Sequence, residues 1–365
     1  MKDGLKKLLY LAAFSLIPTF LIWLPFFIRL PSFWKIPLPQ TGLATIVANY
    51  DGPLYIVAAK TLYNKEQIKA DYQFPLPAEY YTAHFPLFPL LIRALGSITN
   101  YPYAMLAVTL ASSFLAIYFF YKLTGNMFLT FLFSIFPARW LIVRSVGSAD
   151  PLFVATTLAS LYFFKEKKYL AAGIWGAVAG FTKSPGILLF VSYLAYFAWE
   201  KRFDVKKILP LLFIPFSLFA VFLFYYFATG DFLAYFRSGD NIHLFFPPFQ
   251  IFNYSAPWVG TFWLEEIIFV YLFGALGVLR LFKQENYEFA IFAAIFFAST
   301  LFVSHRDLIR YSLPVVPLLL IAFSDVVTRK EFKIALAVIA VPIYLFSLAF
   351  LSQNVMPISN WAPFL

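Results

Sequence analysis

The chain contains no cysteine and few charged residues. Of its 365 residues, 13% are charged, whereas soluble proteins carry about 25%. Without a thiol, the chain cannot form disulfide bonds, cysteine-ligated metal sites or a thiolate nucleophile. The 62% share of hydrophobic residues and the mean hydropathy of +0.77 exclude an ordinary soluble globular protein.

Common nucleotide-binding and hydrolase motifs are also missing. The sequence has neither a Walker A run nor a GxGxxG motif after a strand, which argues against a cytosolic nucleotide as a substrate. It has no GxSxG and no HExxH. The net charge of +10 is typical of basic cytoplasmic loops facing anionic lipid, so we expect no nucleic-acid partner.

What the sequence does have is long apolar runs, which predict an all-α polytopic membrane protein. Examples are LLYLAAFSLIPTFLIWLPFFI and IALAVIAVPIYLFSLAFL, and about 20 apolar residues span a bilayer. The first run is too long for a signal-peptide core, so we interpret it as a membrane anchor. We predict about eleven spans, at 8–28, 101–122, 127–143, 151–164, 169–182, 185–199, 207–228, 261–282, 287–303, 309–325 and 333–351.

Basic residues cluster in alternate short loops, such as KEKK and EKRFDVKK. By the positive-inside rule these loops are cytoplasmic, which also places the N-terminus in the cytoplasm. The other side carries two longer segments, about 29–100 and about 229–260. The first has apolar residues at helical spacing and predicts surface helices. We therefore expect one transmembrane domain over 1–365.

Polar residues at the outer helix ends are the candidates for a functional site, because charge near a membrane is costly. We expect them to converge on one cavity at the outer leaflet. They are Asp51, His84, Arg144, Asp150, Lys183, His305, Arg306, Asp307 and Arg310.

The two acids Asp51 and Asp150 each have a structural and a functional interpretation. Asp51 precedes Pro53 in NYDGPLY, where it is favoured as a helix cap. It is equally placed to act as a general base, since a capping carboxylate keeps one oxygen free. Asp150, in RSVGSADP, caps the fourth span or holds an acceptor sugar. A divalent metal on Asp51 and Asp150 stays an open alternative, because no ligand spacing is diagnostic.

Four cations lie at the same outer ends, namely Arg144, Lys183, Arg306 and Arg310. Such residues either extend toward lipid headgroups or bind a phosphate, which arginine contacts through two parallel hydrogen bonds. Arg306 and Arg310 are four residues apart, which places them on one face if the helix has already started at Arg306. Taken individually, His84 and His305 are weak evidence for a functional site.

Three stretches of this sequence resemble the GT-C superfamily of glycosyltransferases, and most closely its PIG-V-like GPI mannosyltransferase II family. They are NYDGPLYIVAAKTLY, AHFPLFPLLIRAL and SVGSADPLFVATTLASLYFFKEKKYLAAGIWGAVAGFTKSPGILL. The resemblance covers about 45–190, with weaker support at 304–314. Tyr50 stands where the family has Trp, Ala149-Asp150 where it has Glu-Ser, and Lys183 where it has Arg.

The resemblance implies a GT-C-type helical bundle that moves mannose from polyprenyl-phosphate-mannose to a lipid-linked or glycan acceptor, with inversion. It implies Asp51 as the base. It assigns the donor phosphate to Arg144, Lys183, Arg306, Arg310 and His305, and the acceptor or sugar to His84, Asp150 and Tyr50. The active site would face outward, across the plasma membrane in a prokaryote or into the ER lumen in a eukaryote.

Two alternatives stay open at this point. One is a flippase or secondary transporter for a lipid or oligosaccharide. A transporter is expected to have paired repeats and a site near the midplane, whereas this sequence has no such repeat and its polar set lies toward one face. The other is a GT-C enzyme that uses a different sugar or a protein acceptor.

Overall fold

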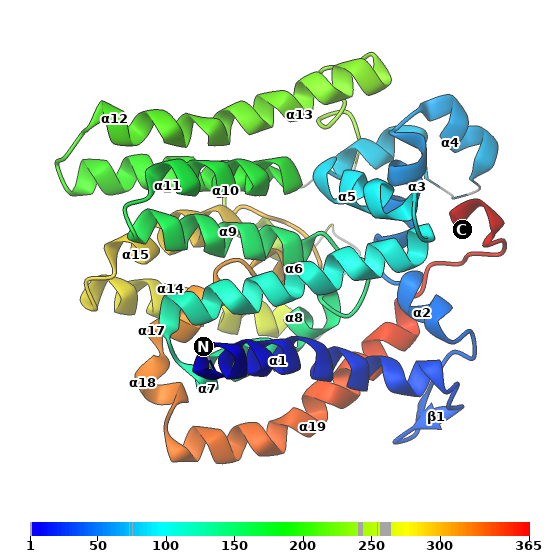
Figure 1. The fold of residues 1–365 in the computed structure, drawn as a ribbon, viewed down its shortest axis with the longest axis horizontal. Coiled ribbons are helices and arrows are strands. Elements are labelled where there is room, and N and C mark those ends of the chain that lie inside the picture. Colours follow the sequence, from blue (N-terminus) through cyan, green and yellow to red (C-terminus); the bar gives the residue numbers. More distant parts are fainter. Residues whose placement is uncertain (1, 73, 75, 240–243, 254, 256–263) are drawn as a thin grey trace.

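The computed structural model describes the chain except for residues 1, 73, 75, 240–243, 254 and 256–263. Its elements are almost all helices, which run side by side in stacked layers (Figure 1). In the described part of the chain, the strands are β1 (Ser32–Phe33) and β2 (Ile36–Pro37), which form one short antiparallel hairpin. The prediction of an all-α chain is therefore confirmed.

Four helical segments among the described residues are long and apolar enough to cross a membrane. They are α1 (Lys2–Phe27), α6 (Tyr101–Thr124), α12–α13 (Val205–Thr229) and α19 (Lys330–Gln353). The most apolar stretch of α6 is 61% buried, whereas those of the other three are 22–28% buried. α6 thus runs inside the bundle, and the others present apolar faces that suit lipid.

Shorter helices complete the bundle, and every predicted span contains helix. They are α7 (Met127–Ile135), α8 (Ala138–Val143), α9 (Asp150–Lys165), α10 (Tyr169–Thr182), α11 (Ile187–Trp199), α14 (Leu264–Lys283), α15 (Tyr287–Thr300), α16 (Leu308–Tyr311), α17 (Val316–Ala322) and α18 (Ser324–Val327). Two predicted spans are broken. Pro137, which has no N–H to continue α7, separates α7 from α8, and the span 309–325 is divided among α16, α17 and α18.

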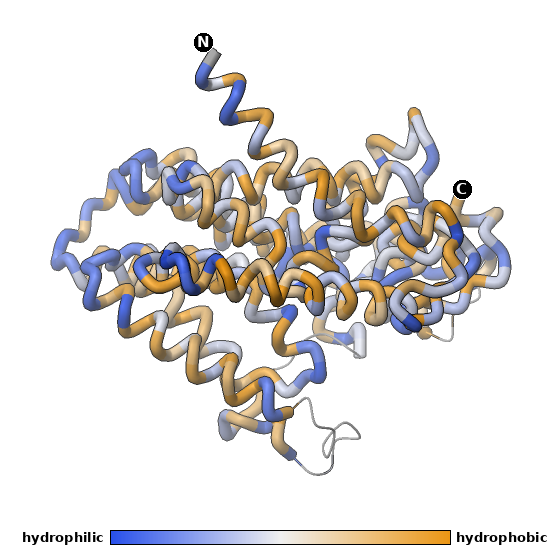
Figure 2. Tube along the Cα trace, turned by 90° about the horizontal axis from the view of Figure 1, so that it is seen from below, coloured by the Kyte–Doolittle hydropathy of each residue, from blue (hydrophilic) through white to orange (hydrophobic). Residues whose placement is uncertain are grey.

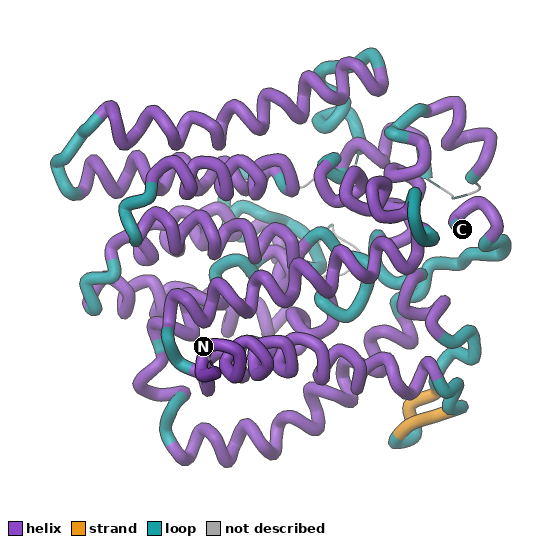
Figure 3. The backbone as a smooth tube through the Cα atoms, in the orientation of Figure 1, coloured by secondary structure: helices purple, strands orange, loops and turns teal. Residues whose placement is uncertain are grey.

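Hydrophilic turns gather at one end of the bundle, seen at the left of Figure 2. The α11–α12 and α14–α15 turns lie at that end (Figure 3), and the basic residues of the α9–α10 and α11–α12 turns are exposed. The opposite end carries the predicted first outer segment.

The first outer segment folds into α2 (Leu43–Val47), α3 (Gly52–Thr61), α4 (Lys65–Asp71) and α5 (Leu87–Gly96). α5 has a hydrophobic face, with Leu91 and Leu95 exposed on the outside, while α3 is buried beneath it and against α6. The second predicted outer segment, 229–260, lies partly outside the described residues, as does the start of the predicted span 261–282. Its described part pairs through Leu244 with Val303, in the loop before α16.

Candidate active site

A cavity of about 1080 Å3 opens where the first outer segment meets the bundle. Its walls come from the turn before α3, the start of α9, the end of α10, the loop 303–311 and the end of α19. All of the site residues predicted from the sequence line this cavity except Arg144. Residues more than 250 positions apart in the chain, such as Asp51 and Arg310, therefore face one space.

The turn that carries Asp51 is fixed by its backbone. Tyr50 has a left-handed conformation with φ of 50°. At Gly52 a Cβ atom would lie 2.6 Å from the carbonyl oxygen of Val47, so only glycine fits there. The main-chain carbonyl of Asp51 accepts the first helical hydrogen bond, from Tyr55, but its side chain makes no capping hydrogen bond. The predicted side-chain cap is therefore not formed, and the carboxylate points into the cavity instead.

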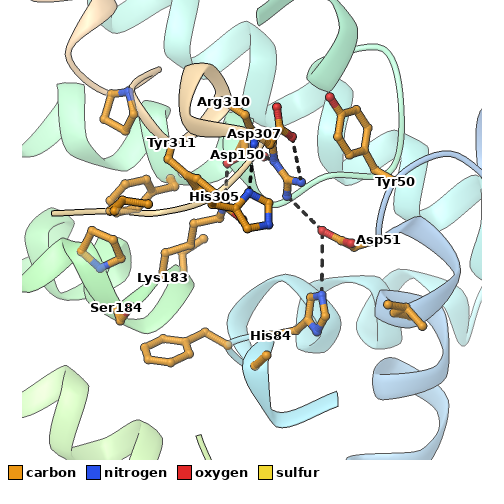
Figure 4. A pocket seen from close by; sticks show the side chains of 18 of the residues that line it. Tyr50, Asp51, His84, Asp150, Lys183, Ser184, His305, Asp307, Arg310 and Tyr311 are labelled. Atoms are coloured by element: carbon orange, nitrogen blue, oxygen red, sulfur yellow. Dashed lines mark hydrogen bonds and ion pairs between the residues drawn. The ribbon is translucent and has the colours of Figure 1, made fainter. Parts of the chain in front are cut away.

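The guanidinium group of Arg310 lies among three carboxylates (Figure 4). Nη2 lies 3.0 Å from Asp51 Oδ2, Nε lies 2.7 Å from Asp150 Oδ2, and Nη1 lies 3.8 Å from Asp307 Oδ2. The Arg310 side chain is only 8% exposed. Because a buried charge is stable only when it is paired and hydrogen-bonded, Arg310 and these acids hold one another in place.

Asp150 is shared by a second cation. Its Oδ1 accepts a hydrogen bond from Lys183 Nζ, and its Oδ2 accepts one from Ser148 Oγ at 2.9 Å. Lys183 lies in the extended link between α10 and α11. Asp150 therefore connects Lys183 to Arg310, and through Arg310 to Asp51.

The carboxylate of Asp51 stays ionised at neutral pH. Burial raises its pKa, but the positive charge of Arg310 and the neighbouring imidazole of His84 outweigh burial and hold the pKa well below its ordinary value. His84 Nε2 lies 3.8 Å from the same oxygen, Oδ2, that faces Arg310. The other oxygen, Oδ1, has no hydrogen bond within the described part of the chain. Asp51 is 27% exposed, so this oxygen is available to a ligand in the cavity.

Arg139 is a residue of this site that the sequence analysis missed. It donates to the Tyr50 hydroxyl at 2.6 Å, and its Nε lies 3.4 Å from Asp307 Oδ1. Its guanidinium group covers the ring of Phe350 at 4.2 Å. The sequence did contain a feature that points to Arg139, since it lies inside the predicted span 127–143 and a charged residue within a span is a candidate for a functional role. Asp307, for which the sequence suggested pairing with Arg310 or Arg306, pairs with Arg310 and also with Arg139.

Arg306 and His305 lie beside these groups in the loop before α16. Arg306 is exposed, lines the cavity and forms no ion pair with the residues that the structure describes. His305 Nδ1 accepts a hydrogen bond from the main-chain N–H of Asp307 at 2.9 Å, and this bond fixes the imidazole beside Tyr311.

The structure does not bring Arg144 to the cavity. Arg144 is fully buried, and its guanidinium group donates to the main-chain carbonyls of Phe14, Ser15 and Ser134. Pro18 has no N–H, so the carbonyl of Phe14 lacks its usual helical donor. The carbonyl of Ser134 is in the last turn of α7, where acceptors are also unpaired. Arg144 thus joins α1 to α7, and the donor site proposed below does not include it.

We expect Arg144→Ala to lower the stability of the protein and to leave donor affinity unchanged. Each buried acceptor left without a partner costs about 1–3 kcal/mol. The measurement is thermal unfolding of the purified protein together with the KM for the donor. Arg202→Ala, which removes an exposed arginine in the α11–α12 turn, is the control and is expected to change neither. Unchanged stability with a raised donor KM would instead support the phosphate role predicted from the sequence.

The acids of the cavity were also considered as ligands of a divalent metal. Among the described residues, no group of three or more His, Asp or Glu side chains is placed to hold a metal ion. Asp51 and Asp150 both face Arg310, so a guanidinium group occupies the position between them that a divalent cation would take.

One part of the cavity wall is apolar. Ile187 and Leu188 follow Lys183 along the chain, and Leu218 and Phe222 of α13 and Phe296 of α15 line the same cavity. A polar region with several cations is thus continuous with an apolar groove between helices, which is a suitable environment for a lipid with a charged head.

Two solved structures are among those similar to this chain, while no family model and no curated protein matches the sequence. Both are crystal structures of ArnT from Cupriavidus metallidurans. The undecaprenyl phosphate-bound structure has a TM-score of 0.55 at 13% identity and covers 90% of this chain and 63% of that chain. The apo structure has a TM-score of 0.54 at 14% identity, and the match covers 82% of this chain and 61% of the ArnT chain.

The fold of this chain is similar to that of ArnT. The chain spans less than two thirds of the length of ArnT, at 63% and 61% in the two structures. The likeness confirms the predicted fold, a helical membrane bundle like that of ArnT, and the long apolar helices support an integral membrane protein. The closer resemblance to the PIG-V-like family stays a prediction.

Proposed function

We propose that this protein is an inverting glycosyltransferase that takes a sugar from a polyprenyl phosphate. Its acceptor is the hydroxyl group of a glycolipid or another glycan, and the resemblance noted in the sequence favours mannose as the sugar. The observation that carries the proposal is the ionised Asp51, with one oxygen available, beside Arg310 in a cavity that continues into an apolar groove. The similarity to the fold of ArnT supports it.

The donor would place its phosphate among Lys183, Arg306 and Arg310, with His305 nearby. Lys183 and Arg310 already share Asp150, whereas Arg306 forms no ion pair with a described residue. We therefore expect the incoming phosphate to meet Arg306 first. The prenyl chain would lie against Leu188, Leu218 and the other apolar side chains of the groove. Undecaprenyl phosphate, which is bound in one of the two ArnT structures, belongs to this chemical class.

The reaction would be a single displacement. The acceptor oxygen forms a bond to the anomeric carbon, the bond from that carbon to the phosphate oxygen breaks, and polyprenyl phosphate leaves. The proton of the acceptor hydroxyl passes to Asp51. A phosphate leaving group needs charge stabilisation more than it needs a proton, and cations already in position supply it.

We also propose that the cavity faces the outer side of the membrane and that the N-terminus is cytoplasmic. The exposed Lys165, Lys167 and Lys168 lie in a turn at the opposite end of the bundle from α3 and the cavity. The positive-inside rule assigns such a turn to the cytoplasm. The outer side would be that of the plasma membrane in a prokaryote and the ER lumen in a eukaryote.

A product assay tests this function. Purified protein in lipid nanodiscs would receive radiolabelled polyprenyl-phosphate mannose or polyprenyl-phosphate glucose, with a lipid extract of its source cells as acceptor. We expect a labelled glycolipid whose new bond has the opposite anomeric configuration to the donor. GDP-mannose in the same assay is the control and should give no product. Transfer from GDP-mannose without a polyprenyl phosphate would contradict the proposal.

A further inference from the structure

The last residue of α19 and the residues that follow it form a strap, defined as residues 353–365, that returns to the first outer segment. In Figure 1 the end of this strap lies beside α3 and α4. The strap is anchored along its length, because Phe364 packs against the rings of Tyr72 and Phe74, the Tyr72 hydroxyl donates to Pro363, and Lys60 Nζ donates to the carbonyl of Leu365 at 2.7 Å. The strap is therefore part of the folded unit.

The first part of the strap is also a wall of the cavity. Gln353, Asn354, Val355, Met356 and Pro357 line it together with Phe350 of α19. Residues 353–357 carry no charged side chain, whereas Lys183 and Arg306 line other parts of the cavity. The wall offers the side-chain amide of Gln353, which both donates and accepts hydrogen bonds, and the amide oxygen of Asn354, whose nitrogen donates to Asn49.

Asn49 joins this wall to the turn that carries Asp51. Its side chain is fully buried and donates to the carbonyls of Leu351 and Thr45 at 2.8 Å and 3.0 Å. It accepts from the side chain of Asn354 at 3.4 Å, and its main chain forms an antiparallel bridge with Val355. Since Asn49 lies two residues before Asp51, the wall and the carboxylate have a fixed relative position.

A series of contacts also links the strap to the cations of the cavity through the Asp51 turn. Lys183 contacts Asp150, Asp150 contacts Arg310, and Arg310 contacts Asp51. The Asp51 turn then contacts the strap through Asn49.

We propose that residues 353–357 form the acceptor subsite. It takes an uncharged, polyhydroxylated group, a sugar or a polyol, and directs one hydroxyl toward Asp51. This inference rests on the proposed function, which supplies the donor and the reaction. Residues 353–357 themselves carry no charge and offer amide groups that suit hydroxyl groups, while Arg139 lies against Phe350 beside them.

The absence of native cysteine permits a direct test by single-cysteine protection in nanodiscs. Gln353→Cys reports on the strap wall, and Phe222→Cys reports on the apolar groove. Ser359→Cys, which is exposed on the same strap but does not line the cavity, is the matched control. The readout is the rate of modification by a water-soluble maleimide, with hexyl mannoside as the acceptor probe and farnesyl phosphate as the donor probe.

We expect hexyl mannoside to slow modification at position 353 about fivefold at about four times its Kd, and farnesyl phosphate to slow modification at position 222 only. Position 359 should respond to neither. Met356→Cys, on the same wall, repeats the measurement if the variant at 353 does not fold. Protection of 353 or 356 by farnesyl phosphate alone, or by neither probe, overturns the acceptor subsite. Failure of farnesyl phosphate to protect 222 would count against the proposed function, independently of the result at 353.

Discussion

Asp51→Asn is expected to lower the rate of sugar transfer by about 100- to 10 000-fold, the range that a general base contributes. Asparagine keeps the shape of the side chain, and its amide oxygen can still accept a hydrogen bond from Arg310, which lies 3.0 Å from Asp51 in the native protein. It cannot take a proton from a hydroxyl group. The donor phosphate binds elsewhere in the proposed site, so the affinity for the donor should persist.

The measurement for Asp51→Asn is the initial rate of transfer together with donor binding in nanodiscs. Asp71→Asn is the matched control, because Asp71 is an exposed acid at the end of α4 and does not line the cavity. It should transfer at the native rate. If Asp51→Asn retained most of its activity, the base would have to be another group and the proposed mechanism would be abandoned.

Arg310→Ala is expected to abolish activity and to destabilise the protein. Its removal leaves Asp51, Asp150 and Asp307 facing one another without their common cation. Breaking a buried ion pair from one side costs about 3–5 kcal/mol. Loss of a group that stabilises developing charge lowers the rate by at least about 100-fold. Both effects act on the same site, so a second substitution is needed to separate them.

Arg310→Lys separates the two effects. Lysine retains the positive charge but not the planar guanidinium group that reaches several carboxylates at once. We expect this variant to recover part of the thermal stability that Arg310→Ala loses and little of the activity. The control is Arg280→Ala, which breaks a pair with Asp325 whose side chains are 35% and 53% exposed and should cost about 0–1 kcal/mol. Native activity in Arg310→Lys would show that catalysis needs only a positive charge at position 310 and not the planar guanidinium group.

Most of the bundle could be predicted from the sequence, because apolar runs report directly on burial in lipid or protein. The outer charged residues could also be predicted, since charge is rare in such a chain. The sequence could not show which of these charged side chains contact one another. Asp51 is a good helix cap by position, yet its side chain faces Arg310 instead, and a contact across 259 positions leaves no local pattern.

Two arginines, one in the third predicted span and one directly after it, show most clearly that the sequence does not determine which way a side chain points. Arg139 and Arg144 are five residues apart, and the sequence favoured Arg144 for the site. The break at Pro137 sends the chain into a new helix, α8, and turns Arg139 toward Tyr50 and the cavity. Arg144 then faces α1, where Pro18 leaves a carbonyl without a donor. The direction of each side chain depends on helix breaks whose geometry is set by tertiary packing.

The contact between Arg144 and α1 has a practical consequence for protein production. The first apolar helix looks like a removable anchor, and a common way to obtain a soluble enzyme is to delete such a segment. Here the deletion would remove the carbonyls of Phe14 and Ser15, two of the three acceptors of the Arg144 guanidinium group, and would leave that buried cation with Ser134 alone. Expression designs should therefore keep residues 2–27 and solubilise the whole chain.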